Sequence, residues 1–144
     1  MKVRCVYNSG KALRNFELDV FLKDEIRGRF GATGFSEYNE LEIGKDYSVM
    51  GIIIFETYQG YLIDSDGFIS VCPTLLFQTL DNEIPNNWYF RSVGKDEDIY
   101  PFIQTIFGYY ELCNDINTYE NLIVEKDYEY QQIYFKRKLE LYKE

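Results

Sequence analysis

The residues of this chain that could do chemistry are carboxylates, tyrosines, lysines and cysteines, because the sequence contains no histidine. Without histidine, Ser-His-Asp and Cys-His nucleophilic catalysis, histidine-containing zinc sites and the commonest general base near neutral pH are all excluded. A pair of carboxylates could still catalyse glycoside hydrolysis. With 24 acidic residues in the chain, some pair will always look suitable, so such a pair is weak evidence for catalysis. We therefore expect no enzyme and name no catalytic residue. A carboxylate-based enzyme is kept as the third alternative.

Two other patterns resemble chemical sites. Cys5, Cys72 and Cys113 are odd in number and widely spaced, which is typical of neither a disulfide framework nor a zinc site. We expect them to be buried thiols in a reducing compartment. Asp64 and Asp66 look like the start of a calcium loop, but its later ligands are missing, so a hairpin turn is the better interpretation. The sequence therefore predicts no metal and no cofactor.

Negative charge dominates the chain and is unevenly distributed. The net charge is −9, made up of +3 over residues 1–35, −14 over residues 36–135 and +2 over residues 136–144. A field of this sign repels phosphate backbones, so we expect no nucleic acid partner. The same field would steer a basic protein toward the chain. The alternative explanation is that the negative charge only keeps the protein soluble.

Two segments combine acidic and aromatic side chains, and we expect them to contact a partner. Aromatic residues anchor interfaces, and carboxylates steer and orient the encounter. The alternative for each segment is a solvated loop. The candidate partner-binding residues are Glu37, Tyr38, Glu40 and Glu42 in the first segment, and Asp96, Glu97, Asp98 and Tyr100 in the second.

The first two thirds of the chain, residues 1–93, are expected to be mainly β. The alternation of Phe16, Leu18, Val20 and Leu22 indicates a strand, and the glycines of residues 28–34 indicate a flexible surface loop. A central strand, covered on both faces, opens a three-stranded meander. The expected strands are 2–7, 47–55, 60–63, 68–71 and 88–93, with a hairpin turn at 64–67 and a helical turn at 73–77.

The last third is expected to be mainly helical, over residues 109–142. Asn117 and Glu120 fit a capping box, and Asp127 fits the N-cap of a final helix ending near Tyr142. The apolar face expected for that helix carries Tyr128, Phe135, Leu139 and Tyr142. Strands followed by helices predict one α+β domain over residues 1–144. Within it, the N-terminal antiparallel sheet curls into a small SH3-like or partly open barrel, with the C-terminal helices packed on one side.

No targeting or membrane segment is expected. The N-terminus lacks the apolar stretch of a signal peptide, and the longest apolar run, residues 49–55, is far shorter than the ~20 residues of a membrane helix. A cytoplasmic location and no membrane partner are the resulting expectations.

Several patches resemble a family of small uncharacterised bacterial proteins, some of which are encoded beside secreted toxins. The patches are residues 1–11 (MKVRCVYNSGK), 43–52 (IGKDYSVMGI), 61–63 (YLI), 76–77 (LF) and 88–90 (WYF). The resemblance implies toxin immunity or another inhibitory binding role. It carries over no catalytic residue.

The leading hypothesis is a cytoplasmic acidic binding protein, an immunity-type inhibitor that neutralises a basic toxin domain such as a nuclease. The alternative is an accessory module that binds a peptide or a small molecule in an aromatic groove. We expect a monomer or a weak dimer whose partner is a basic protein such as a cognate toxin.

Overall fold

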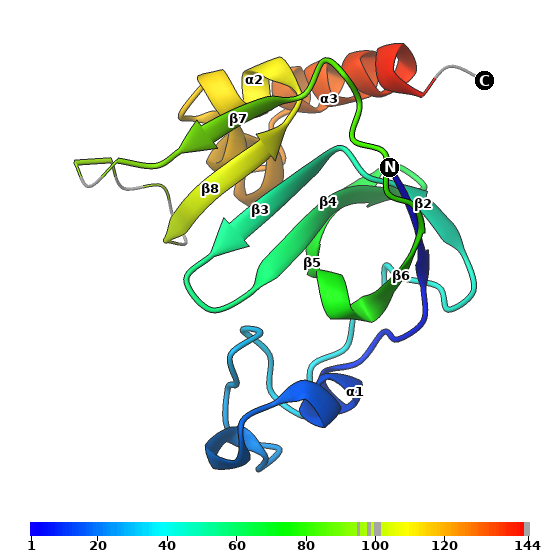
Figure 1. Ribbon diagram of the computed structural model, residues 1–144, viewed down its shortest axis with the longest axis vertical. Helices are drawn as coiled ribbons and strands as arrows, with labels where there is room; N and C mark the ends of the chain where they lie inside the picture. The colour runs from blue at the N-terminus through cyan, green and yellow to red at the C-terminus, as the bar shows by residue number, and fades with distance from the viewer. Residues whose placement is uncertain (95, 98, 100–101, 143–144) are drawn as a thin grey trace.

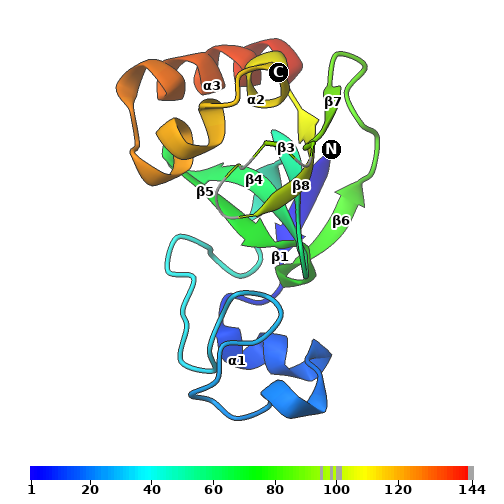
Figure 2. The same cartoon turned by 90° about the vertical axis from the view of Figure 1, so that its left-hand side faces the viewer.

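The computed structural model, shown in Figures 1 and 2, describes residues 1–94, 96–97, 99 and 102–142. Its strands and helices form a mixed α+β structure. The strands are β1 (Lys2–Cys5), β2 (Asp46–Ser48), β3 (Gly51–Phe55), β4 (Gln59–Ser65), β5 (Phe68–Pro73), β6 (Phe77–Asp81), β7 (Tyr89–Ser92) and β8 (Ile103–Gly108). The α-helices are α1 (Gly10–Leu13), α2 (Tyr110–Asn114) and α3 (Tyr128–Leu141), the 3-10 turns are η1 (Arg14–Phe16), η2 (Asp19–Phe21) and η3 (Thr74–Leu76), and η4 (Glu120–Val124) is a π-helical turn.

The described strands form two antiparallel sheets, of order β2-β1-β6 and β5-β4-β3-β8-β7. In the smaller sheet, the expected first strand is confirmed as β1. Val3 and Cys5 of β1 are fully buried, whereas Lys2 and Arg4 point outward. The third member, β6, was missing from the sequence prediction. Only Phe77 of its five residues is buried, so β6 offers no alternation of apolar and polar residues to detect.

The expected meander is confirmed as β3, β4 and β5 in the larger sheet, with β3 in the central position. Asp66 and Gly67 have φ values of 48° and 92°, as a two-residue hairpin turn requires. The expected strand 47–55 is wrong in one respect. It is divided into β2 and β3, which belong to different sheets, and residues 49–50 lie between them.

Strand β8 lies between β3 and β7, in a stretch between the expected β and helical parts for which the sequence predicted no strand. Its register against β3 shifts by one residue, because Ile54 pairs with Thr105 but Phe55 pairs with Ile103. This β-bulge puts Ile103 and Ile106 on the buried side at a spacing of three residues. The sequence therefore lacks the period-two pattern that identifies a strand.

The strand expected around Phe16–Leu22 is wrong, because this region forms 3-10 turns within a loop lobe. Figure 1 shows the lobe, in blue, below the two sheets. Its organising group is the carboxylate of Glu17, whose side chain is almost fully buried between Arg14, at 3.7 Å, and Arg29, at 3.8 Å. The segment 28–34 is an irregular loop as expected, but Phe30 within it is buried in the core.

Helices α2 and α3 lie together on one side of the larger sheet, at the top of Figures 1 and 2. Helix α2 sits close to the sheet because Gly51 and Gly108 face each other across β3 and β8. A Cβ atom at either position would lie 2.6 Å from Cδ2 of Leu112. The two glycines therefore make the space in which Leu112 packs.

The predicted cap of α3 is confirmed, since the Asp127 side chain accepts a hydrogen bond from the Glu129 N–H. Of the predicted apolar face, Phe135 and Tyr142 do pack against the core. The prediction is wrong at Tyr128 and Leu139, which are 71% and 74% exposed. Tyr134 is buried instead, and its hydroxyl donates to Asp64 of β4. Lys138 binds the same carboxylate at 2.7 Å. The buried side of α3 therefore includes a charged residue, which an apolar pattern cannot reveal.

The capping box at Asn117 and Glu120 is also absent, because η4 has no side-chain cap. Asp115 takes over part of this role by accepting a hydrogen bond from the Asn117 N–H. After η4, Lys126 adopts a left-handed backbone with a φ of 56°. Its ammonium donates to the Ile69 carbonyl on the edge strand β5 and lies 4.3 Å from the Phe68 ring centroid. Lys126 therefore caps one edge of the larger sheet.

Candidate functional site

The first predicted segment lies in the loop before β2. Glu37 forms a β-bridge with Ser9, and Glu37 and Glu42 are exposed. Tyr38 is half-buried, and burial raises the pKa of its phenol above the ordinary value. Glu40 lies against β5, where its Oε1 accepts a weak hydrogen bond from Cys72 Sγ at 3.6 Å. This segment therefore offers a partner two exposed carboxylates, and its tyrosine packs against the core.

The second predicted segment lies in the connection between β7 and β8. Asp96 is exposed, and Glu97 forms an ion pair with Arg91, which holds the pKa of the Glu97 carboxyl below its usual range. The predicted partner-binding residues Asp98 and Tyr100 lie outside the described residues. Strands β5 and β7 are the two opposite edges of the larger sheet. The two predicted segments therefore lie at different edges and form no joint site in the described structure.

Glu97 does line a hollow that sequence reasoning missed, at the end of the sheet where the β3–β4 turn meets the β7–β8 connection. This hollow has a volume of about 540 Å³ and is also lined by Glu56, Ile99 and Phe102. A second hollow of about 430 Å³ lies beside it, lined by Arg27, Phe55 and Tyr58 together with Glu56 and Phe102. Glu56 and Phe102 line both hollows, so the two form one continuous surface, called here the Phe102 surface.

Phe102 is the most unusual residue of this surface. Its side chain is 69% exposed, and its backbone has a φ of 64°, in the left-handed region that bulky residues rarely occupy. Such a conformation costs on the order of 1–3 kcal/mol and is found preferentially at functional sites. A hydrogen bond of 3.0 Å from the Ile103 N–H to the Ile99 carbonyl holds the neighbouring backbone. The loop therefore presents an aromatic ring to solvent at an energetic cost.

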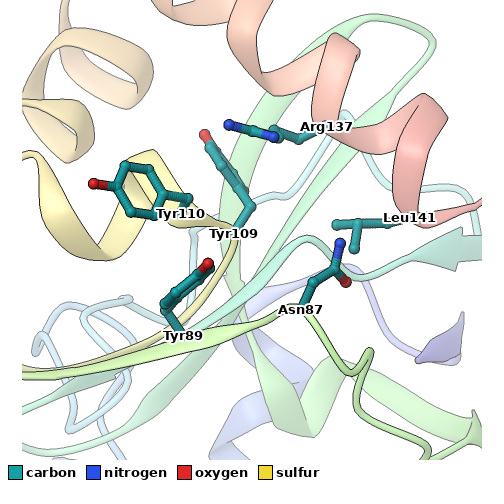
Figure 3. A pocket seen from close by; sticks show the side chains of 6 residues that line it. All are labelled: Asn87, Tyr89, Tyr109, Tyr110, Arg137 and Leu141. Carbon is teal, nitrogen blue, oxygen red and sulfur yellow. The ribbon is translucent and has the colours of Figure 1, made fainter.

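A third cavity, of about 360 Å³, lies between α2, α3 and the start of β7 (Figure 3). We call it the tyrosine pocket. Its rim includes Tyr89 and Tyr110, whose rings meet edge to face at a centroid distance of 5.2 Å. The lining residues are Asn87, Tyr89, Tyr109, Tyr110, Arg137 and Leu141. The adjacent tyrosines at 109 and 110 were the only sequence signal for it, because the other residues come from distant segments.

Arg137 is held at this pocket by carboxylates from two helices. Its Nε donates to Glu111 Oε1 at 2.7 Å and its second terminal nitrogen donates to Glu111 Oε2 at 2.6 Å. The first terminal nitrogen donates to Glu140 at 2.9 Å. The guanidinium lowers the pKa of the Glu111 carboxyl, mainly through these hydrogen bonds. These two ion pairs hold the Arg137 side chain between Glu111 of α2 and Glu140 of α3.

Ion pairing and burial account for the pKa shifts of the carboxylates and thiols in the described part of the chain. The pKa values of Asp46, Glu97 and Glu111 are all displaced downward by an arginine, which is opposite to what a general acid needs. Burial raises the pKa of Cys113 to about 11 and that of Cys72 to about 12, so neither thiol is activated as a nucleophile. Among the described residues, no three Cys, Asp or Glu side chains gather into a set that could hold a metal ion.

In the part of the chain that the structure describes, no helix has the length and hydropathy needed to cross a bilayer. Comparisons with models of protein families, with curated proteins and with solved structures find no match to this chain.

Proposed function

We propose that this chain is a cytoplasmic binding protein of the immunity type, which neutralises a basic partner such as a toxin nuclease domain. The observation that carries the proposal is Phe102, an exposed ring held in a left-handed conformation between two hollows that share the Glu56 carboxylate. An aromatic side chain with carboxylates beside it is the combination that anchors and orients a cationic protein surface.

The distribution of ion pairs supports a cationic partner. Most arginine side chains are paired with carboxylates of the same molecule, as in Arg4–Asp46 and Arg91–Glu97. Of the described lysines, Lys45 and Lys138 are paired in the same way. Because acidic residues outnumber basic ones by 24 to 15, these pairs leave exposed carboxylates such as Glu37, Glu42 and Glu56 without a cation in the described structure. Uncompensated carboxylates accelerate encounter with a positively charged partner.

The resemblance to small proteins encoded beside toxins supports the same role. The SH3-like, partly open barrel stays part of this proposal, with the Phe102 surface placed where the β3–β4 turn meets the β7–β8 connection. A monomer or weak dimer is the expected form, since one copy already contains the whole surface.

The test is a toxicity-rescue assay, in which this chain is co-expressed with the product of the adjacent gene, followed by measurement of the Kd for the purified pair. We expect rescue by the unmodified chain. Phe102→Ala should weaken binding by about 30-fold or more, as the truncation of an interface anchor does. Phe90→Ala is the matched control, because Phe90 is another exposed phenylalanine but lies on β7, outside both hollows.

Raising the ionic strength should slow association, because the proposed encounter is steered by carboxylates. A neighbouring product that neither forms a complex nor is neutralised would contradict the inhibitor role. Equal binding by Phe102→Ala and Phe90→Ala would contradict the proposed surface.

A second candidate function is an accessory module that binds a peptide or small molecule in an aromatic groove. The tyrosine pocket favours it, because three tyrosines and an arginine converge on a cavity of about 360 Å³. This volume is within the usual range for small-molecule sites.

A further inference from the structure

The Tyr109 phenol is a buried polar group whose hydroxyl has no hydrogen-bond partner among the described residues. Its side chain lines the tyrosine pocket and is only 1% exposed. Burial raises the pKa of the phenol, so the hydroxyl keeps its proton at neutral pH. Because buried hydroxyls nearly always find a partner, this O–H at the wall of the pocket is an unused donor.

Other donors accompany it. Three of the five N–H groups of Arg137 bind Glu111 and Glu140, which leaves two N–H groups without a carboxylate among the described residues. Figure 3 shows the Tyr109 hydroxyl and the Arg137 guanidinium on the same side of the pocket. The Asn87 amide, which can also donate, lines it as well. A pocket rich in donors selects a ligand with an oxygen acceptor.

The charges around the pocket define the ligand further. Arg137 is paired with two carboxylates, so an anion gains little from it and meets the negative field of the whole chain. A cation would face the guanidinium itself. The rings of Tyr89 and Tyr110, which meet edge to face, and the side chain of Leu141 make the remaining wall apolar. These properties favour an uncharged, planar group.

We propose that the tyrosine pocket binds a neutral planar ring that carries a carbonyl or amide oxygen. The oxygen accepts hydrogen bonds from Tyr109 Oη and from a free N–H of Arg137, and the ring packs against Tyr89 and Tyr110. This inference rests on the second candidate function and specifies its ligand class. It is independent of the inhibitor role, which depends on Phe102 and Glu56.

The probes are benzamide, benzoate and benzylamine, which share a ring and differ in charge. Each is titrated into the ¹⁵N-labelled protein, and the amide shifts of residues 87–89 and 109–110 are followed. Benzamide should saturate these shifts with a Kd of roughly 1–10 mM, as expected for so small a ligand. Benzoate and benzylamine should bind at least about tenfold more weakly. No saturable binding by benzamide, or stronger binding by either charged probe, would overturn the proposal.

Variants test the role of the hydroxyl. Tyr109→Phe should weaken benzamide binding by about tenfold, through loss of one buried hydrogen bond. It should not lower the melting temperature, since the free protein loses no hydrogen bond. Tyr110→Phe is the matched control, because its hydroxyl points away from the other pocket residues in Figure 3, and its Kd should change by less than twofold. If Tyr109→Phe binds benzamide as tightly as the unmodified chain, the assigned donor is wrong.

The same variants separate the two proposals. Tyr109→Phe should leave toxicity rescue unchanged, and Phe102→Ala should leave benzamide binding unchanged. A chain that rescues but does not bind benzamide would refute the ligand inference alone.

Discussion

Helix α3 should owe much of its attachment to one hydrogen bond, between Tyr134 and Asp64. The tyrosine is fully buried, its Oη lies 3.1 Å from Asp64 Oδ1, and the carboxylate side chain is only 7% exposed. Tyr134→Phe preserves the ring but leaves this oxygen with Lys138 as its only donor among the described residues. A buried hydrogen bond to a charged acceptor contributes about 1.5–3 kcal/mol, so we expect the free energy of unfolding to fall by about 2 kcal/mol.

The assay is urea unfolding followed by far-ultraviolet circular dichroism, with a thermal scan in parallel. For a chain of this length, 2 kcal/mol corresponds to a fall of about 4–8 °C in the melting temperature. Tyr128→Phe is the control, because it removes a hydroxyl from an exposed tyrosine of the same helix. It should change the unfolding free energy by less than about 0.5 kcal/mol.

Repeating the Tyr134→Phe substitution in a second variant, Asp64→Asn, tests whether the charge of the acceptor causes the loss of unfolding free energy. In Asp64→Asn the acceptor is neutral, so Tyr134→Phe should cost only about 1 kcal/mol there. If Tyr134→Phe is no more harmful than Tyr128→Phe, or costs the same in both backgrounds, the charged acceptor does not hold α3 in place.

Two further predictions concern α2. Gly51→Ala places a Cβ atom 2.6 Å from Leu112 Cδ2 and 2.9 Å from the Phe107 carbonyl oxygen, so it should destabilise the protein by about 1–3 kcal/mol in urea unfolding; a neutral effect would show that α2 is free to shift. The pKa of Glu111 is lowered from its ordinary 4.5 by Arg137, so its stabilisation is present above pH 4.5 and is lost as pH falls through the folded-state pKa. The stability difference between the unmodified chain and Glu111→Gln, about 0.5–1 kcal/mol at pH 7 for this partly exposed pair, should therefore shrink in acid, and a difference that grows on acidification would contradict this sign.

Elements specified by local chemistry could be predicted from the sequence. The β-branched run of β3, the Asp66-Gly67 turn and the Asp127 cap each depend on residues that are close in the chain. The free, buried cysteines were expected because no partner spacing was present, and the structure confirms that all three are free and buried.

Elements organised by distant contacts could not be predicted. The bulge in β8 depends on its register against β3, which the chain segment alone does not specify. The loop lobe depends on a buried Glu17 whose arginine partners include one 12 residues away. The face of α3 was misassigned because Lys138 is paired with Asp64 from β4, and a lone lysine in a helix is normally placed in solvent.

In the candidate site, too, features set by neighbouring residues could be predicted and features set by distant contacts could not. The acidic segment around Glu97 was identified from composition, and this residue does line a hollow. Glu56 and Phe102 were missed because a carboxylate in a short turn and a phenylalanine in a loop are ordinary features of a sequence. In the structure they stand out through the left-handed backbone at Phe102 and through the meeting of the β3–β4 turn with the β7–β8 connection.

The lysine at the edge of β5 has a consequence for crowded solutions. An uncovered terminal strand can recruit strands of other molecules and so start a fibril or a precipitate. Lys126 occupies the Ile69 carbonyl and places a positive charge beside it, so it discourages such growth. Acetylation of this side chain would remove that charge and free the carbonyl. Loss of this amino group, which follows η4, should therefore lower the concentration at which the protein remains dispersed.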